Sequence, residues 1–330
     1  MPQMEKNITS ASPRQYICIT QSGCFISSGG ADFLIDPGAG GALTARCRYK
    51  KPNAVLISSS RTECSGGFSQ LYTPGGQMLF YTSSMTKKMM YRQYVRYGKL
   101  LKRAAACSDS SAVEEIMSCS FRSRIVINRG KRNQAEVFFY PAGSFPGMSA
   151  IYIRTNQSSI LYTCGGLPSW EKLPEAEVYI IRLRRRASSM PELLSSGGAV
   201  INTGSFSDIF DVISFFNGSD DRTVGIDRSV LEPACDFLRF GYPVFSEKIR
   251  PLSGCRSDPE FIISARSRIY PGRIKIPSEL FSQAPALSDI YAFCSKDKAK
   301  KVFVVSPDIK RSCEQYRGNI FFCGSGTYKL

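Results

Sequence analysis

The sequence predicts a mixed α/β fold in which short apolar strands alternate with polar loops and helices. The stretch from Val55 to Phe68 shows this pattern most clearly. Val55–Ile57 is expected to form a buried strand, a polar turn follows, and Gly66 and Gly67 let the backbone bend before a helix begins near Phe68. Such a unit presents side chains at the carboxyl end of a sheet, where α/β proteins commonly bind ligands.

The same alternation recurs in the second half of the chain. Apolar residues within 197–206 and at 224–227 each precede an expected helix, at 207–216 and at 230–240. Strands that alternate with helices favour a parallel sheet. With 330 residues, of which 43% are hydrophobic, the chain can bury a substantial core and form two domains or one large one.

The remaining elements follow from short apolar runs and from the helical spacing of buried residues. Strands are expected at 16–19, 33–35, 78–82, 125–127, 136–140, 151–153, 178–181, 261–265 and 319–323, and within the segments 160–166 and 301–307. Helices are expected at 85–101 and 112–117, and residues 1–14 are expected to form a loose tail. This tail lacks the apolar core of a signal peptide, and no membrane span is expected.

Composition narrows the chemistry that the chain can perform. Histidine is absent, which excludes a Ser-His-Asp triad, a Cys-His dyad and any histidine zinc site. The 12 cysteines are irregularly spaced, so we expect reduced thiols in a cytosolic or nuclear protein rather than a zinc finger. Lys and Arg number 43 against 27 Asp and Glu, and this formal charge of +16 favours a polyanionic partner. A solvated basic surface without function is the alternative.

The stretch Val55–Gly67 resembles the first metal-binding motif of the metallo-β-lactamase superfamily, an apolar strand followed by His-x-His-x-Asp-His and Gly-Gly. Ser59, Arg61 and Cys64 stand where the three histidines would be, and Glu63 stands where the aspartate would be. Zinc is bound by imidazole, thiolate or carboxylate groups, and an arginine cannot be deprotonated in a protein. The resemblance therefore implies that the metal ligands have been lost.

Four further segments, one before this stretch and three after it, resemble other motifs of the same superfamily, in the same order along the chain. They are the strand and loop 33–38 with the structural Asp36, segment 141–150 with Ser144 for a histidine, segment 160–166 with Gly165 for the bridging aspartate, and segment 301–307 with Ser306 for a histidine. In nucleases of the superfamily an acidic residue follows the strand at 178–181, and here Arg182 takes that place. Segment 197–216 resembles the opening of the β-CASP insertion.

These resemblances imply an αββα metallo-β-lactamase sandwich with a short inserted β-CASP-like α/β domain. The expected organisation is a tail at 1–14, a metallo-β-lactamase-like domain at 15–195, a reduced insertion at 196–295 and return strands at 296–330 that complete the first domain. Hydrolysis in the superfamily uses a metal-bound water as the nucleophile, so a chain without these ligands is expected to bind no zinc and to be inactive.

The superfamily contains inactive subunits of the cleavage and polyadenylation specificity factor and of Integrator, and each pairs with an active β-CASP endonuclease. The resemblance implies an RNA-associated scaffold subunit of an mRNA 3′-end processing complex. Its expected partners are the active paralogue and other processing subunits, and its expected location is the nucleus, with the cytoplasm as the alternative. No membrane partner is expected.

Two other functions remain open. The first is a metal-dependent hydrolase or exonuclease with a site rebuilt from Glu63, Cys64 and Cys164, which predicts stoichiometric zinc and loss of activity on Cys64→Ala. The second is a free-standing nucleic-acid-binding protein. Candidate nucleic-acid contacts are basic residues at the lost site, in one expected hairpin turn and in one basic run: Arg61, Arg129, Lys131, Arg132, Arg182, Arg184, Arg185 and Arg186.

Overall fold

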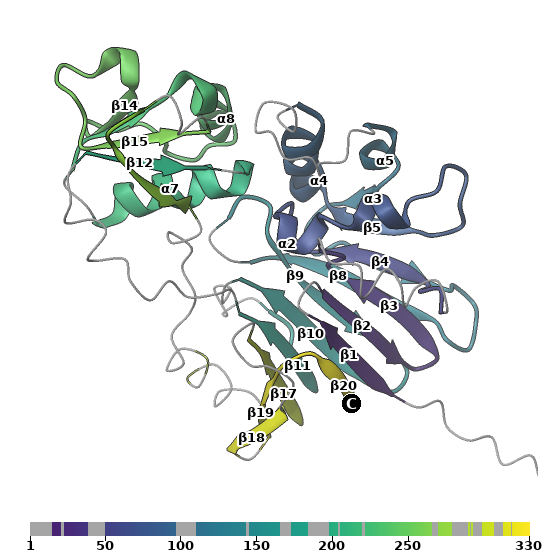
Figure 1. Cartoon of the computed structure of the whole chain (residues 1–330). Coiled ribbons are helices and arrows are strands. Elements are labelled where there is room, and N and C mark those ends of the chain that lie inside the picture. The colour runs from purple at the N-terminus through teal and green to yellow at the C-terminus, as the bar shows by residue number, and fades with distance from the viewer. Residues whose placement is uncertain are drawn as a thin grey trace, which may run out of the picture.

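The computed structural model describes most of the chain as three β-sheets with short helices around them (Figure 1). The residues that it describes are 15–20, 23–38, 50–96, 110–142, 145–165, 173–183, 198–203, 205–219, 222–265, 270–278, 290, 292, 299–306, 313–317 and 319–330. Two sheets form a sandwich, and the third forms a separate α/β unit. None of the helices in these ranges has the length and apolarity to cross a membrane.

Sheet A has seven strands in the order β20-β1-β2-β3-β4-β5-β6. Its antiparallel part runs from β20 to β3, and its parallel part runs from β3 to β6. The strands are β1 (Tyr16–Thr20), β2 (Gly23–Ser28), β3 (Ala31–Ile35), β4 (Ala54–Ile57), β5 (Phe80–Ser83), β6 (Met117–Cys119) and β20 (Gly326–Lys329).

Sheet B has eight strands in the order β18-β19-β17-β11-β10-β9-β8-β7. Its central strands β10, β11, β17 and β19 are parallel, and the flanking pairs are antiparallel. The strands are β7 (Ile125–Ile127), β8 (Ala135–Pro141), β9 (Ser149–Arg154), β10 (Ser159–Cys164), β11 (Val178–Arg182), β17 (Lys301–Val305), β18 (Cys313–Arg317) and β19 (Ile320–Cys323).

One continuous apolar core lies between sheets A and B. Leu56 from sheet A belongs to it together with Tyr162 and Phe303 from sheet B. The neighbours Val55 and Ile57 point to the other face of β4 and pack in a second core beneath helices. Because both faces of these strands are buried, their sequences are almost uninterrupted apolar runs. The α/β sandwich predicted from the sequence is confirmed.

Short helices cover the outer face of sheet A (Figure 1). They are α2 (Thr62–Ser65), α3 (Phe68–Leu71), α4 (Ser84–Met90), the π-helical turn η1 (Tyr91–Arg96) and α5 (Ser110–Glu114). Helix α4 begins where it does because the Ser83 side chain accepts a hydrogen bond from the Thr86 N–H at 3.0 Å. The outer face of sheet B carries its own core, which includes Ile290.

Sheet C is a third, fully parallel sheet in the order β14-β13-β15-β12-β16. Its strands are β12 (Ala199–Asn202), β13 (Val224–Ile226), β14 (Ile249–Pro251), β15 (Phe261–Ser264) and β16 (Ile274–Pro277). Helices α7 (Phe206–Ser219) and α8 (Arg228–Arg239) pack on it through a core that also takes in Met89, Phe145 and Met148 of the sandwich. The inserted unit is therefore joined to the sandwich by apolar packing.

Several predicted elements differ from the observed ones. The helix expected at 85–101 is α4 followed by η1, and residues 97–101 lie outside the described ranges. The helix expected at 112–117 ends at Glu114, because Met117 begins β6 and pairs with β5. The polar turn expected after β4 contains helix α2, and the helix expected from Phe68 is only the four-residue α3. Strands β2, β6, β14, β16, β18 and β20 were not predicted, because they are short or interrupted by small and polar residues.

Gly67 is required where the turn after β4 approaches the end of β3. Its N–H donates to the Pro37 carbonyl at 2.5 Å, and a Cβ atom at this position would lie 2.6 Å from the Gly38 oxygen and 2.7 Å from the Pro37 oxygen. Both obstacles are backbone atoms. A side chain at residue 67 would therefore have to displace one of the two chain segments that build the candidate site.

We expect Gly67→Ala to lower the free energy of unfolding by about 1–3 kcal/mol, because the new methyl group overpacks against backbone. Urea denaturation followed by circular dichroism measures the change. Gly218→Ala in α7 is the matched control, since a Cβ there meets open space, and it should be neutral or stabilising by up to about 1 kcal/mol. Equal stability of Gly67→Ala and the wild type would contradict the close approach.

Candidate functional site

The residues that follow five strands gather at one edge of the sandwich. Asp36 follows β3, Ser58–Arg61 follow β4, Cys164 ends β10, Arg182 ends β11 and Ser306 follows β17. Parallel strands bring their carboxyl ends to the same edge of a sheet, which is the usual place for a site in α/β proteins. The Gly165 N–H donates to the Arg182 carbonyl at 2.9 Å, and the Ser306 N–H donates to the Cys323 carbonyl at 3.3 Å.

Arg61 is the largest fully buried side chain at this edge, and only 1% of its surface is exposed. Its two terminal nitrogens donate to the two carboxylate oxygens of Asp211 in α7, with N–O distances of 2.7 and 2.6 Å. The guanidinium carbon lies 4.5 Å from the centre of the Phe145 ring. A bidentate ion pair and an aromatic face therefore fix the guanidinium between the sandwich and the inserted unit.

The charge of Arg61 is maintained by its partner. Burial alone lowers the pKa of a guanidinium, but the attraction and the hydrogen bonds of Asp211 outweigh burial and raise the pKa of Arg61 above its usual value. Asp208 and Glu63 add to the attraction. Arg61 is thus a permanent cation at the position where the resemblance implies a metal ligand.

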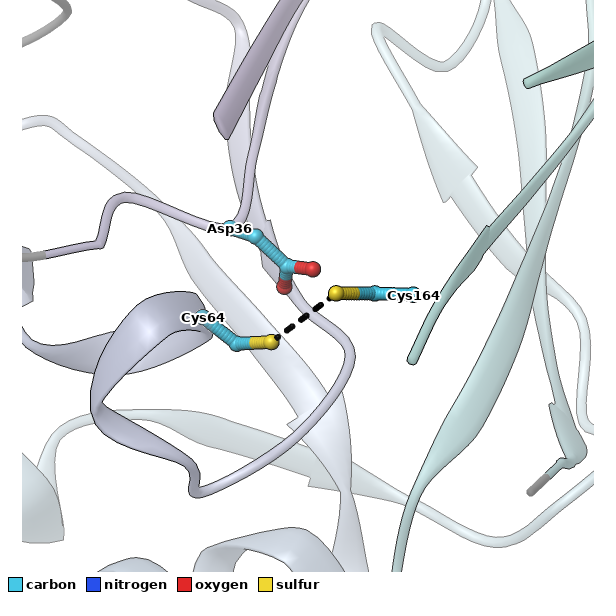
Figure 2. Close-up of side chains that lie close together, drawn as sticks. All are labelled: Asp36, Cys64 and Cys164. Carbon is cyan, nitrogen blue, oxygen red and sulfur yellow. Dashed lines mark hydrogen bonds between the residues drawn. The ribbon is translucent and has the colours of Figure 1, made fainter. Parts of the chain in front are cut away.

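Beside Arg61 lies a compact group formed by Asp36, Cys64 and Cys164 (Figure 2). One ligand atom from each residue lies within 4.8 Å of the other two, and all three residues are buried. The Cys64 and Cys164 sulfurs are 3.5 Å apart and share a hydrogen bond. Cys64 lies in helix α2, which follows strand β4 of sheet A. Cys164 is the last residue of strand β10 in sheet B, so the group joins the two halves of the sandwich.

A tight hydrogen-bond network holds the Asp36 carboxylate. One oxygen accepts from the Ser58 N–H at 2.7 Å, and the other accepts from the Ser58 hydroxyl at 2.6 Å and from the Tyr162 hydroxyl at 2.8 Å. The backbone of Asp36 is left-handed, with φ of 52°, a conformation that aspartate tolerates better than most residues. Burial raises the pKa of Asp36 despite these donors.

Arg182 supplies a second buried cation on the Cys164 side of the edge. Its guanidinium donates to the Glu63 carbonyl at 3.2 Å, which links β11 to α2. The hydrogen bond from the Cys64 thiol and the charge of Arg182 lower the pKa of Cys164, although burial opposes them. The pKa of Cys64 is raised, because its thiol donates this hydrogen bond and is itself buried.

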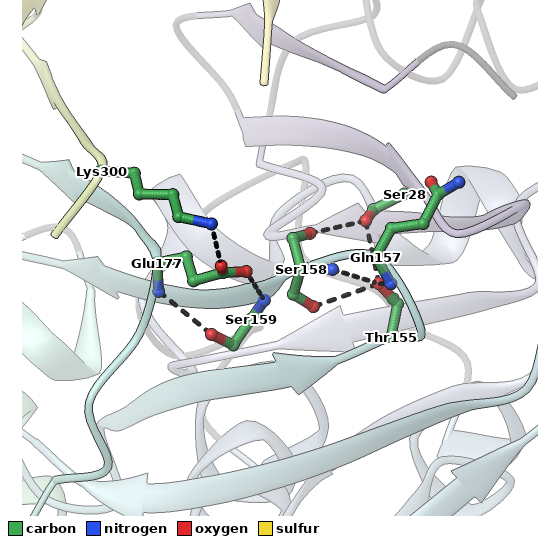
Figure 3. Close-up of polar contacts among 7 residues, drawn as sticks. All are labelled: Ser28, Thr155, Gln157, Ser158, Ser159, Glu177 and Lys300. Atoms are coloured by element: carbon green, nitrogen blue, oxygen red, sulfur yellow. Dashed lines mark hydrogen bonds and ion pairs between the residues drawn. The ribbon is translucent and has the colours of Figure 1, made fainter. Parts of the chain in front are cut away.

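The opposite edge of the sandwich carries polar contacts of another kind (Figure 3). The Ser28 hydroxyl lies 2.8 Å from the Ser158 hydroxyl and 3.1 Å from that of Thr155, which joins β2 to the turn between β9 and β10. Glu177, just before β11, accepts from the Ser159 N–H at 3.2 Å and pairs with Lys300. These contacts hold strand ends together, whereas the buried cations and thiols lie at the carboxyl edge.

The donors at the carboxyl edge do not fit the dizinc centre of the superfamily. The sequence has no histidine, and Arg61, Gly165 and Ser59 offer neither a thiolate nor a carboxylate. The Arg61 guanidinium would also repel a metal ion at its own position. The thiol and carboxylate atoms that do cluster come from Asp36, Cys64 and Cys164. The sequence predicted a rebuilt site of Glu63, Cys64 and Cys164. This prediction is corrected, because in the structure Asp36 takes the place of Glu63 as the acidic member of the cluster.

The structure settles the location of some predicted nucleic-acid contacts. Arg61 and Arg182 are buried, so they are removed from the set of surface contacts. Arg129, Lys131 and Arg132 are exposed in the turn between β7 and β8. The predicted residues Ser144, Arg184, Arg185 and Arg186 lie outside the described ranges.

Sequence reasoning missed two partners of Arg61. Asp211 lies 150 residues further along the chain, and nothing in the sequence distinguishes it from Asp208, the other aspartate of the same helix. Phe145 lies within the predicted segment 141–150, next to Ser144, but its side chain is apolar and gives no signal of this contact. The role of both residues depends on how the inserted unit docks, which no local pattern encodes.

Comparison with known proteins supports the fold and leaves the family open. No protein-family model matches the sequence, and no curated protein matches it. A solved protein of unknown function from Enterococcus faecalis V583 is similar over 96% of this chain and 100% of that chain, with 12% identity and a TM-score of 0.56. This similarity includes the inserted unit and shows the fold alone.

Two further solved structures are similar over about half of this chain. The metallo-β-lactamase fold protein YhfI from Bacillus subtilis has 15% identity and a TM-score of 0.37, covering 54% of this chain and 74% of that chain. Zinc-bound PqqB from Methylobacterium extorquens has 12% identity and a TM-score of 0.34, covering 50% of this chain and 62% of that chain. Similarity at these TM-scores adds nothing about function.

We expect Asp211→Ala to lower the free energy of unfolding by about 3–5 kcal/mol, because it leaves the Arg61 charge buried without its counter-ion. The double variant Arg61→Met/Asp211→Leu should recover most of the loss, since it removes both charges. Urea denaturation of the wild type, Arg61→Met, Asp211→Leu and the double variant gives the coupling energy.

Asp258→Ala is the control for the Asp211 experiment. Like Asp211, Asp258 forms an ion pair with an arginine, in this case Arg273 of the inserted unit. The Asp258 side chain, however, is 82% exposed. Exposed ion pairs contribute about 0–1 kcal/mol. A loss for Asp211→Ala no larger than that for Asp258→Ala would show that the buried pair does not hold the two units together.

Proposed function

We propose that this chain is a catalytically inactive member of the metallo-β-lactamase superfamily that serves as a scaffold. The observation that carries the proposal is the buried Arg61–Asp211 ion pair at the edge where hydrolases of this superfamily hold their metals. Superfamily membership is supported by the order of the sequence motifs and by the location of Arg61, Cys64, Gly165 and Ser306 at strand ends along one edge.

The physical argument for inactivity concerns charge. A hydrolytic metal must lower the pKa of a bound water, and it needs three or four donor groups to stay bound. At residue 61 the chain has a guanidinium that cannot lose its proton, and Asp211 is fully engaged by it. The same pair spans from the loop after β4 to α7. The ion pair therefore fixes the inserted unit against the sandwich, which is a structural role and not a catalytic one.

The finer proposal is that the inserted unit is a reduced β-CASP domain and that the chain is an RNA-associated subunit of a nuclear 3′-end processing complex. Its proposed partners are an active, histidine-bearing β-CASP endonuclease and other processing subunits. The parallel sheet C with α7 and α8 supports an α/β insertion of this kind. The charge of +16 is consistent with RNA in the complex.

The experiment combines affinity purification of the tagged full chain with an activity assay. We expect a histidine-bearing β-CASP paralogue among the co-purifying proteins, and no cleavage of RNA, DNA or ester substrates by the isolated chain with added zinc or manganese. Asp211→Ala tests whether partner binding depends on the Arg61–Asp211 ion pair. If the inserted unit no longer docks firmly on the sandwich, the amount of co-purifying partner should fall. Turnover that scales with added metal and disappears in Cys64→Ala would overturn the proposal.

A second function, nucleic-acid binding by the isolated chain, is favoured by one specific observation. Arg129, Lys131 and Arg132 are exposed together in the tight turn between β7 and β8, where Gly130 has φ of 73°. Three cations on one short turn can contact successive phosphates. This function is compatible with a scaffold and can be measured separately.

We expect the triple variant Arg129→Gln/Lys131→Gln/Arg132→Gln to weaken binding to single-stranded RNA. For single strands, each phosphate contact contributes about 0.7 to the steepness with which the logarithm of the binding constant falls with the logarithm of the salt concentration. Loss of three contacts should therefore make this slope shallower by about 2. Fluorescence anisotropy across a salt series measures the slope. Arg250→Gln/Arg256→Gln/Lys275→Gln removes the same charge from exposed positions of the inserted unit. An equal effect of both triple variants would contradict a role specific to this turn.

A further inference from the structure

The Asp36, Cys64 and Cys164 group has the spacing of a metal site, although it is not the site of the superfamily. The two sulfurs lie 3.5 Å apart. Two thiolates bound to one zinc ion at about 2.3 Å in tetrahedral geometry lie about 3.8 Å from each other. A disulfide requires about 2.05 Å, so oxidation would have to bring the sulfurs about 1.5 Å closer. The observed spacing is nearer to that of two ligands of one ion.

The carboxylate of Asp36, the third donor, is held close to the two sulfurs. The carboxylate of Asp36 lies within the 4.8 Å group, and hydrogen bonds from Ser58 and Tyr162 fix its orientation. Ligands held by a surrounding hydrogen-bond network are typical of metal sites in proteins. Two thiolates and one carboxylate form a donor set that suits zinc and other thiophilic divalent ions.

The local charges balance around a divalent ion. Two thiolates and a carboxylate carry a charge of −3, a divalent cation brings the total to −1, and the buried guanidinium of Arg182 brings it to zero. Arg182 is electrostatically coupled to all three donors, Asp36, Cys64 and Cys164. Arg61 and Glu63 lie at the border of this group and attract each other, and Arg61 also pairs with Asp211. A nearly neutral total matters here because a net buried charge is costly.

We propose that Asp36, Cys64 and Cys164 bind one thiophilic divalent cation, such as zinc, as a structural site that joins the two sheets of the sandwich. Asp36 lies on sheet A, Cys64 lies on the helix that follows β4, and Cys164 ends β10 of sheet B. The site shares the position of Cys64 with the motif of the superfamily, but Asp36 and Cys164 stand at none of the ligand positions that the resemblance implies, and the proposal goes beyond the scaffold function. Its three donors are buried and come from both halves of the sandwich, so the bound ion stabilises the fold, and a ligand from outside this group completes the fourfold coordination that zinc prefers.

The first test is metal content and cobalt substitution of the full chain. Purification without chelators should give one equivalent of zinc per chain by elemental mass spectrometry. Replacement by Co²⁺ should give a thiolate-to-cobalt charge-transfer band in the near ultraviolet, which reports sulfur ligation directly. Removal of the ion should lower the melting temperature, and addition of zinc should restore it, because an ion that binds only the folded state stabilises it.

The second test uses matched cysteine variants. Cys64→Ser and Cys164→Ser should each reduce bound zinc at least tenfold and abolish the cobalt band. Cys119→Ser and Cys255→Ser, which change thiols outside the group, should leave both unchanged. If the two site variants do not fold, wild-type protein answers the question alone, because chelation followed by addition of Co²⁺ either produces the thiolate band or does not.

The outcomes separate this inference from the proposed function. One ion per chain, sulfur ligation and no turnover support the structural site and are compatible with the scaffold. No bound ion at saturating zinc, or a Cys64–Cys164 disulfide in protein purified under reducing conditions, overturns the structural site and leaves the scaffold proposal standing. Hydrolysis that depends on Cys64 overturns the scaffold proposal and shows that the ion is not merely structural.

Discussion

The buried ion pair between Arg61 and Asp211 is the constraint on which the arrangement of the two units depends. Its members come from the loop after β4 and from α7, and neither charge can stay buried without the other. A pair of this kind adds little net stability relative to apolar residues of the same volume. Its geometry is nevertheless selective, because both guanidinium nitrogens must meet both carboxylate oxygens while the ring of Phe145 faces the cation. The pair therefore determines the position and orientation of α7 on the sandwich more than the stability of this contact. The stability comes from apolar contacts, such as those of Phe145 with Phe210 and Phe237.

Two buried arginines with different partners lie at the carboxyl edge. Arg61 is neutralised across the boundary with the inserted unit, and Arg182 faces the thiols and Asp36 inside the sandwich. This division explains why the two arginines are not interchangeable, although both stand in place of acidic or ligand positions. Arg61 connects two units, and Arg182 connects β11 to α2 through the Glu63 carbonyl. Loss of either positive charge would disturb a different interface.

The sequence predicts the layers of this fold better than its site, for a physical reason. Strands such as β4 and β10 are buried on both faces, so a short apolar run marks them without knowledge of their neighbours. Strand β2 was missed because its glycine and serines resemble a turn, and its burial arises only after pairing with β1 and β3. The position of Cys64 could be predicted from the motif, but its approach to Cys164 depends on the stacking of the two sheets. The partner of Arg61 could not be predicted at all, because Asp211 reaches it only when α7 docks.

The strand ends meet at one edge for a reason that lies in where the folding energy comes from. The paths of β3, β4, β10, β11 and β17 are set by apolar side chains packed between and outside the sheets, whereas Asp36, Arg61, Arg182 and Ser306 at the strand ends lie outside these apolar clusters. Strand ends are therefore free to change chemistry while they continue to meet at one place. Buried side chains at these strand ends must still satisfy the rule that buried charge is compensated, and this rule leaves few solutions. A guanidinium paired across the domain boundary is one solution, and thiols with a carboxylate beside a second guanidinium are another.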